Sequence, residues 1–441
     1  MTLLKPHAAA RLLAAAAALF WLALACGQAR AQDKLGPYDR DSARAMLSMI
    51  RDDLKSNYYD PNFRGLKLEE KFKEADDRIK AAQTRDQLMI PIAQFLLSLD
   101  DSHTVFLPPG RAARIEYGWR VQMVGDRCFV TALKPKSDAE SKLKPGDEVI
   151  SIDGFRPTRA TLWKMHYRYY ALAPARAVRF VVQSPGEAQP REVTVESKIE
   201  MGQAVRQWQD ILMQSLREEW DIVRVRTSEA GDDRLLIWKM PTFEVEDQVV
   251  DDMMGRAHRF KTLVLDLRGN GGGYEDALVR LAGYFFDHDL KVAERKGRKE
   301  SKVVTAKTRG DKVFKGNLVV LVDSDSGSAA EMFARVVQLE KRGTVIGDHT
   351  AGAVMTSKYY GRETGVGRVL YFGSNITIGD VLMSDGQSLE RVGVTPDEVL
   401  LPTGADLAAH RDPALARAAE LAGVKLDPEK AGALFPVDWK K

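Results

Sequence analysis

The N-terminal part of the chain carries apolar residues at helical spacing. Four of them occupy positions i, i+3, i+4 and i+7, which lie on one face of a helix: Ala43, Met46, Leu47 and Ile50. A second apolar set over residues 88–96 favours another helix, and both segments are otherwise rich in charged residues. The pattern predicts a helical region over residues 32–112.

Near residue 113 the pattern changes to short apolar and β-branched runs separated by turns. Four runs have the length and composition of strands: residues 119–124, 128–133, 178–183 and 193–196. Residues 144–154 are typical of a turn, a strand and a second turn with glycine. We therefore predict a compact α+β module over residues 113–200.

From residue 234 onward, predicted strands and helices alternate. The expected strands are residues 235–238, 263–267, 318–322 and 344–346, and the expected helices are residues 249–260, 276–286 and 331–339. This alternation is typical of βαβ units, which build a parallel sheet covered by helices. The sequence thus predicts an α/β core over residues 201–410. A tail over residues 411–441 follows, with a short alanine-rich helix after Pro413.

The first 31 residues have the features of an export signal. Lys5 and Arg11 supply positive charge, residues 12–25 are apolar, and a small-x-small cleavage site ends at Ala31. The apolar run of 14 residues is too short to span a bilayer comfortably, and no later stretch reaches 18. We predict a signal peptide over residues 1–31 and an exported protein, periplasmic or secreted.

A lipid anchor at Cys26 is the alternative for this segment. Leu22 stands one place too early for a good lipobox, which disfavours the anchor without excluding it. Cys26 and Cys128 are the two cysteines of the chain. If cleavage follows Ala31, Cys128 is alone and no intrachain disulfide can form.

The composition is that of a globular protein, since 44% of the 441 residues are hydrophobic and 29% are charged. Residues 1–31 hold three basic residues and no acid, so their removal takes the net charge from +3 to neutral. A neutral chain argues against a broad nucleic-acid-binding face. No His and Cys residues have metal-ligand spacing, so no metal or other cofactor is expected, and Asp287–Asp289 is expected to be a polar turn.

The first segment that could carry chemistry is Asp-Leu-Arg-Gly-Asn-Gly-Gly-Gly-Tyr at residues 266–274, between a buried strand and a helix. Glycines there allow positive φ and let backbone N–H groups face a ligand. The run is not a dinucleotide fingerprint, because Tyr274 breaks the spacing, and it is not a P-loop, because no Gly-Lys-Ser/Thr follows. A tight strand-to-helix turn without a ligand is the alternative interpretation.

The second segment surrounds Ser328, which follows a buried strand and stands near the start of a predicted helix. Free N–H groups and the positive end of the helix dipole favour negative charge at such a position. It therefore suits a nucleophile with an oxyanion site beside it. The alternative is structural, because Ser328 and Glu331 form the Ser-x-x-Glu pattern of a capping box.

Two further segments contain candidate residues of weaker individual significance. Ser102 and His103 lie between two acids and an apolar strand-like run, in a chain with seven histidines. A lone histidine is more often structural or at the surface than catalytic. Glu390, within residues 388–397, carries no meaning by itself.

Together and in this order, these segments resemble the C-terminal processing (tail-specific) protease superfamily, including its tricorn core protease branch. The resemblance runs from about residue 40 to residue 405. Residues 116–200 look like its PDZ domain, with 144–154 the most specific part. Residues 266–273 and 327–331 resemble its paired protease-core motifs, and residues 390–397 resemble its closing motif. The resemblance implies a ClpP/crotonase-like α/β protease core with an inserted PDZ-like α+β domain and an N-terminal helical region.

The resemblance also implies that Ser328 is the nucleophile. Backbone N–H groups of Ala329 and of Gly271 or Gly272 would then form the oxyanion hole. Members that use a Ser-Lys dyad carry Gly-Lys in the loop after the nucleophile helix, whereas Ala353 stands at the lysine position here. Another base is therefore required to take the serine proton.

The tricorn-like branch uses a histidine preceded by a serine, with a glutamate completing the site. Ser102, His103 and Glu390 match these positions, and the ordinary pKa of imidazole lies near neutral pH. We predict that His103 is base and then acid, while Ser102 and Glu390 orient and polarise the site. Lys358 and His349 remain rival bases because they lie in or just after the loop that contains Ala353.

PDZ-type modules bind C-termini by adding the peptide to a sheet edge as a strand and capturing its carboxylate with N–H groups. Tyr117, Gly118 and Trp119 are the expected carboxylate loop of this chain. The alternative is that the module acts only as a structural lid over the cleft.

The sequence thus predicts an ATP-independent serine endopeptidase that acts on exported polypeptides, either unfolded or with exposed C-termini. Two alternatives stay open. One is a catalytically silent, protease-like binding or scaffold protein, which Ala353 favours. The other is a peptidase that a partner activates through the PDZ-like module.

Overall fold

The computed structural model describes residues 35–110, 113–201, 225–365, 369–437 and 439. The expected signal peptide, with Cys26, lies outside the described residues, and so does the segment 202–224. Over the described ranges, the helices are too short or too polar to cross a membrane.

A six-stranded sheet lies in the larger part of the protein. In spatial order its strands are β18 (Glu398–Val399), β15 (Thr344–Gly347), β14 (Asn317–Val322), β11 (Thr262–Asp266), β10 (Leu235–Lys239) and β9 (Arg226–Ala230). The first five pair in parallel, and β9 pairs with β10 in the antiparallel direction. The predicted parallel sheet is therefore confirmed.

Helices cover both faces of this sheet. Successive residues of each strand point to opposite sides, so each face presents its own apolar side chains to a layer of helices. The helices are α8 (Asp247–Ala257), α9 (Glu275–Ala282), α10 (Ala329–Leu339), α12 (Pro413–Leu421) and α13 (Pro428–Ala433). A further short helix, α11 (Gly404–Ala408), lies against Gly146 instead. Leu236 and Trp238 of β10 share a core cluster with α8, α9 and α10, whereas Leu235 and Ile237 pack with α12 and α13. The residues after 411, expected as a tail, thus supply one layer of the core.

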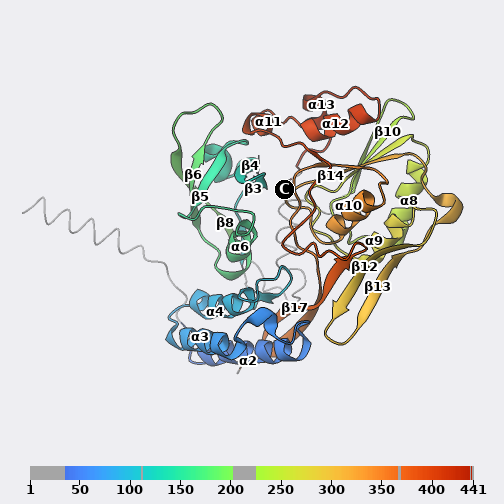
Figure 1. Cartoon of the computed structure of the whole chain (residues 1–441). Helices are drawn as coiled ribbons and strands as arrows, with labels where there is room; N and C mark the ends of the chain where they lie inside the picture. The colour runs from blue at the N-terminus through green and yellow to red at the C-terminus, as the bar shows by residue number, and fades with distance from the viewer. Residues whose placement is uncertain (1–34, 111–112, 202–224, 366–368, 438, 440–441) are drawn as a thin grey trace, which may run out of the picture.

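A second, antiparallel sheet lies beside the first and was not predicted from the sequence. Its strands are β1 (Val105–Leu107), β12 (Leu290–Gly297), β13 (Ser301–Ala306), β16 (Met355–Thr364) and β17 (Leu370–Met383). β17 pairs with β1, β12 and β16. Figure 1 shows this strand running from the core to the N-terminal helices. It therefore brings the chain near residue 105 to the core.

The N-terminal helices are α2 (Asp39–Asn57), α3 (Leu68–Ala81) and α4 (Arg85–Leu97), with a short 3-10 turn, η1 (Phe63–Gly65). The apolar face predicted for residues 43–50 is buried in α2, and α4 contains the second apolar set. These helices pack around Phe372 and Ile376 of β17. Both helices expected from apolar spacing are confirmed.

Residues 113–201 form the predicted α+β module, which lies apart from the central sheet in Figure 1. Its elements are β2 (Ala113–Glu116), β3 (Trp119–Val124), β4 (Arg127–Leu133), α5 (Asp138–Lys142), β5 (Glu148–Ile152), α6 (Leu162–Tyr167), η2 (Arg168–Leu172), β6 (Ala177–Gln183), β7 (Arg191–Glu196) and β8 (Lys198–Met201). β2 and β8 pair where the chain enters and leaves the module. The other five strands form one sheet with β3 and β7 at its edges.

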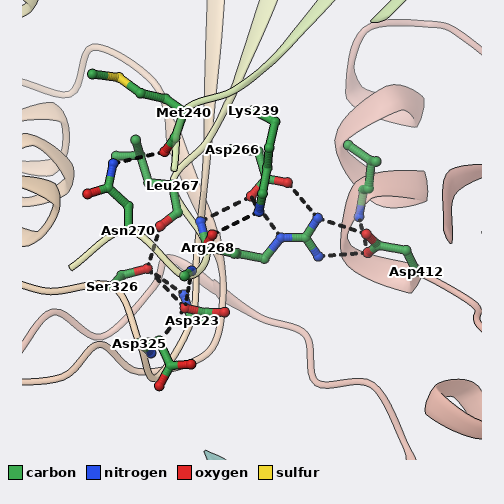
Figure 2. A network of polar contacts seen from close by, with 12 residues as sticks. Lys239, Met240, Asp266, Leu267, Arg268, Asn270, Asp323, Asp325, Ser326 and Asp412 are labelled. Carbon is green, nitrogen blue, oxygen red and sulfur yellow. Dashed lines mark hydrogen bonds and ion pairs between the residues drawn. The ribbon is translucent and has the colours of Figure 1, made fainter. Parts of the chain in front are cut away.

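A network of charged side chains ties the C-terminal helices to the glycine run (Figure 2). Arg268 donates to both carboxylate oxygens of Asp266, at 2.9 and 2.8 Å, and to both of Asp412, at 2.9 and 2.7 Å. Burial alone would raise the pKa of Asp266, but the charges of Arg268 and Lys239 outweigh it and hold that pKa well below its usual range. Asp412 also caps α12 by accepting from the N–H of Leu415 at 2.9 Å. One carboxylate therefore fixes both a helix start and the arginine that precedes the glycines.

We expect Asp412→Ala to lower the free energy of unfolding by about 2–4 kcal/mol, because it removes a helix cap and leaves Arg268 with one partner fewer. Asp427→Ala is the matched control. Asp427 also caps a helix that begins with proline, but it is exposed and binds the Lys430 N–H without an arginine. Urea denaturation of both variants measures the difference. Equal losses would show that the pair with Arg268 adds nothing beyond the cap.

Candidate active site

The glycine run and the segment around Ser328 lie in direct contact, beyond the ends of the neighbouring strands β11 and β14. The N–H of Gly327 donates to the carbonyl of Asn270 at 2.8 Å. A Cβ placed on Gly272 would lie 2.6 Å from the Cβ of Ser328, so a side chain at that position would collide with the serine. The structure thus brings two of the predicted segments together.

Ser328 is the N-cap residue of α10, with φ of 52° and ψ of −116°. A non-glycine residue in this region is strained by about 1–3 kcal/mol and persists only where its surroundings fix it. Two acceptors share the N–H of Ser328: Glu331 Oε2 at 3.0 Å and the carbonyl of Ala353 at 3.0 Å. The chain therefore turns sharply from strand to helix at a half-buried serine.

The carboxylate of Glu331 organises this turn from inside the protein. It is fully buried. Besides Ser328, it accepts hydrogen bonds from Thr350 Oγ1 at 2.5 Å and from the N–H groups of Gly352 and Ala353 at 2.8 and 2.9 Å. Burial raises the pKa of Glu331 to about 7, although the donated hydrogen bonds favour the carboxylate. The expected capping contact is present, and Glu331 also holds the loop at 350–353.

Ser102, His103 and Glu390 form a continuous hydrogen-bonded chain. Ser102 Oγ lies 2.7 Å from His103 Nδ1 and 2.7 Å from Glu390 Oε2, and the Ser102 N–H donates to Glu390 Oε1 at 2.8 Å. Burial raises the pKa of Glu390, and the hydrogen bonds from Ser102 lower it. Three residues chosen from the sequence therefore meet across a separation of 288 residues.

Ala353 and Val354 connect this chain to Ser328. The carbonyl of Ala353 accepts from the Ser328 N–H at 3.0 Å, and the N–H of Val354 donates to Glu390 Oε2 at 3.0 Å. In the described part of the chain, no hydrogen bond joins the hydroxyl of Ser328 directly to the ring of His103. Residues 353–354 thus bind the backbone of Ser328 on one side and Glu390, the partner of Ser102, on the other.

Two of the three N–H groups expected at the oxyanion hole have no hydrogen-bond acceptor within the described ranges: those of Gly271 and Ala329. The N–H of Gly272 donates to Asn270 Oδ1 at 2.8 Å. A side chain at Gly272 would also come within 3.1 Å of the Ala329 nitrogen, which places that N–H beside the glycine run. Between the two glycines left open by the sequence, the geometry favours Gly271.

Comparison with known proteins now identifies the chain. Residues 234–400 match the family described as Peptidase family S41. The chain is 24% identical over 370 residues to a chloroplastic C-terminal processing peptidase of Tetradesmus obliquus, covering 78% of this chain and 74% of that protein. It is 26% identical over 334 residues to a carboxy-terminal-processing protease of Bartonella bacilliformis, covering 71% and 70%. The chain belongs to the C-terminal processing protease family. It is a serine-type peptidase.

Solved structures share the mixed α/β fold of this C-terminal processing protease. Mature CPAF complexed with lactacystin has a TM-score of 0.61 at 14% identity and covers 84% of this chain and 95% of its own. The photosystem II D1 C-terminal processing protease has a TM-score of 0.51 at 18% identity, with 89% of this chain and 100% of its own covered. The family and the α/β core are therefore confirmed, while the PDZ-like and tricorn-like assignments stay predictions.

The two rival bases lie in different surroundings from His103. The Lys358 side chain is exposed on β16, and its ammonium lies 5.7 Å from the centre of the Tyr360 ring. His349 Nδ1 lies 3.0 Å from the carbonyl of Thr350, and a Cβ at Gly393 would come 2.8 Å from the imidazole. Neither contact directs the side chain to Ser328.

The expected carboxylate loop has its aromatic side chains in the module core. Tyr117 and Trp119 are 1% and 0% exposed, and their rings lie 5.5 Å apart. Gly118 has a φ of +71°, and its carbonyl accepts from the N–H of Lys134 at 2.9 Å. A ligand could therefore meet only the backbone of this loop, and its role in binding stays a prediction.

The edge strand β3 of the module contacts the loop that precedes Ser328. Gln122 Nε2 donates to Asp323 Oδ2 at 2.7 Å, and Ser324 Oγ donates to the carbonyl of Met123 at 2.6 Å. Arg120 forms an ion pair with Asp325 at 3.5 Å. Burial and the neighbouring Asp323 raise the pKa of Asp325 to about 6. The sequence analysis had no signal for this contact, because the partners lie about 200 residues apart.

The structure places no metal-ligand group in this site. His288 lies beside Asp287, with 2.9 Å between Nδ1 and Oδ1, and both side chains are exposed. Over the described ranges, no three His, Cys, Asp or Glu side chains lie close enough together to hold an ion.

Asp323 is a site residue that the sequence reasoning missed. Its carboxylate accepts from the N–H of Gly269 at 2.8 Å and from the N–H of Asp325 at 3.1 Å, so it joins the glycine run to the loop before Ser328. One feature of the sequence could have indicated it: Asp323 directly follows a buried strand, much as Asp266 ends one.

We expect Gly272→Ala to reduce peptidase activity at least about a hundredfold, because the added methyl group displaces Ser328. Gly386→Ala is the matched control: its φ of +81° is equally unsuited to alanine, but no atom lies within 4 Å of the added Cβ. Hydrolysis rates on an unfolded protein and thermal midpoints of both variants provide the comparison. Activity near that of the parent in Gly272→Ala would contradict the assigned contact.

Proposed function

We propose that this chain is an exported, ATP-independent serine endopeptidase of the tricorn-like branch, with Ser328 as nucleophile and His103 as base. Its substrates are polypeptides that are unfolded or have exposed C-termini. The names of its processing-protease relatives support the substrate class, and the charged and apolar pattern of residues 1–31 supports export.

The observation that carries the proposal is the position of Ser102 Oγ, 2.7 Å from both His103 Nδ1 and Glu390 Oε2. A hydroxyl has one proton to donate, and an ionised carboxylate can only accept. Ser102 therefore donates to Glu390 and accepts from His103, which places the imidazole proton on Nδ1. The lone pair on Nε2 is left to take the proton of Ser328.

The reaction then follows acyl-enzyme chemistry. As Ser328 Oγ attacks the scissile carbonyl carbon, its proton passes to His103 Nε2. The same proton goes to the leaving amine when the C–N bond breaks, and an acyl ester remains on Ser328. Water attacks this ester and gives a proton to His103, which returns it to Ser328 Oγ as the ester C–O bond breaks and the new C-terminus is released. No step requires ATP.

The developing oxyanion needs fixed donors where its charge appears. The N–H groups of Ala329 and Gly271 are the proposed donors, with Gly272 nearby as the position that must lack a side chain. Ala329 is the first residue of α10, so the positive end of the helix dipole adds to this stabilisation.

The decisive test is digestion of an unfolded protein by the mature chain, read by mass spectrometry. We expect Ser328→Ala and His103→Ala each to reduce cleavage at least about a thousandfold, because each removes a reacting group. Lys358→Met and His349→Ala should leave turnover nearly intact.

Each other outcome points elsewhere. Cleavage lost in Ser328→Ala but kept in His103→Ala would leave a serine peptidase and transfer the base to Lys358 or His349. No cleavage by the parent, together with no labelling of Ser328 by a serine-directed covalent probe, would favour the silent binding protein. Labelling without cleavage would favour a peptidase that needs an activating partner.

The PDZ-like module is proposed to capture substrate C-termini at the edge strand β3, with the backbone of Tyr117, Gly118 and Trp119 near the carboxylate. Edge strands offer unpaired backbone groups to an added peptide. The contacts of β3 with Asp323 and Ser324 equally suit a module that only covers the candidate site as a lid.

We expect a substrate with a C-terminal amide to show a KM several times higher than the same peptide with a free carboxylate, with kcat little changed. Steady-state kinetics on the two peptides provide the measurement. Equal KM values would favour the lid.

A further inference from the structure

Asp101 is a buried carboxylate next to the Ser102–His103 pair. Asp101 is 2% exposed. It accepts four hydrogen bonds, from His103 N–H at 3.0 Å, Thr104 N–H at 2.6 Å, Thr377 Oγ1 at 2.8 Å and Tyr58 Oη at 2.8 Å. All four groups donate to it, so the Asp101 side chain acts only as an acceptor here.

These contacts fix the loop that presents the base. Two of them come from the backbone of the loop itself, and the other two come from the end of α2 and from β17. Thr104 Oγ1 also donates to Thr377 Oγ1 at 3.0 Å and accepts from the Thr377 N–H at 3.1 Å, which doubles the tie to β17. The orientation of His103 is thus set by elements on either side of the loop.

The charge of Asp101 also acts on the imidazole. Burial lowers the pKa of His103 below 6.5, and the negative charge of Asp101 opposes that shift. Other charged or titratable groups packed around the loop are Tyr58, Tyr59, Arg64, Asp380, Glu390 and Arg391. A buried carboxylate beside a histidine stabilises the imidazolium that forms during catalysis.

We propose that Asp101 is a positioning residue of the peptidase, which holds the Ser102–His103 loop in register and stabilises the charged form of His103. The proposal rests on His103 acting as the base. Its neighbour Asp100 provides a contrast, because that side chain is 69% exposed and pairs with Arg391 at 2.9 Å. The two adjacent acids therefore differ in burial and in their partners.

The test separates charge from stability. In Asp101→Asn the amide keeps a carbonyl acceptor for the loop N–H groups but loses the charge. We expect kcat to fall about tenfold or more with KM little changed. Activity needs neutral His103 and is lost as pH falls through its pKa, so the acid limb of kcat/KM should move to lower pH than in the parent. Asp100→Asn, which removes an exposed charge, should leave both unchanged.

A titration that needs no activity gives the second readout. His103 is followed by NMR in the Ser328→Ala background with labelled histidine, assigned by comparison with His103→Gln. We expect Asp101→Asn to lower the pKa of His103 and Asp100→Asn to leave it in place. An unchanged His103 titration and an unchanged acid limb in a folded Asp101→Asn variant would overturn the proposal.

Two safeguards keep the outcomes distinct. If Asp101→Asn does not fold, Tyr58→Phe removes one support and keeps the charge, and kcat should then fall without any lowering of the His103 pKa. An unchanged kcat in Tyr58→Phe would overturn the positioning role. If the parent cleaves nothing, the proposed function fails, while the titration still decides whether Asp101 acts on His103.

Discussion

The hydrogen bonds of one buried carboxylate, that of Glu331, hold the rest of the site in place. Ser328 has a strained backbone that no regular helix start would impose, and Glu331 binds its N–H together with three donors of the 350–353 loop. A hydrogen bond contributes about 0.5–1.5 kcal/mol, and more when the acceptor is charged, so the four together offset a backbone strain of about 1–3 kcal/mol. The next residue of this loop, Val354, binds Glu390, which in turn binds Ser102, and Ser102 binds His103.

The same device recurs around the site. Glu390, Asp101 and Asp323 each accept backbone N–H groups from loops that have no regular pairing partner. Irregular loops leave such N–H groups without ladder acceptors, and a buried donor without an acceptor is costly. A carboxylate with several lone pairs satisfies two or three of them at once. Rigid loops can therefore carry reacting groups that helices and strands would not bring together.

Much of the fold could be predicted because its signals are local. Continuous apolar runs marked β10, β11 and β14, and helical spacing marked α2 and α4. The antiparallel sheet was missed because β16 is mostly polar, with Met355 its one buried residue, and because β17 also pairs with the distant strands β1 and β12. Helix α9 ends at Ala282 rather than Phe286, although the aromatic residues that follow are buried. Asp101 and Asp323 were invisible as site residues because an acid acquires such a role only from long-range contacts.

The long reach of the site has a consequence for the biogenesis of the protein. Ser102 and Glu390 are 288 residues apart. The loop that holds Ser102 and His103 directly precedes β1, so it is supported only after β1 has paired with β17. Contacts of this separation form late, because they must overcome the loop-closure entropy of most of the chain. A chain that is still being synthesised therefore lacks the assembled candidate site. With the catalytic residues proposed above, the peptidase would be silent toward its own unfolded segments until nearly the whole of it has folded.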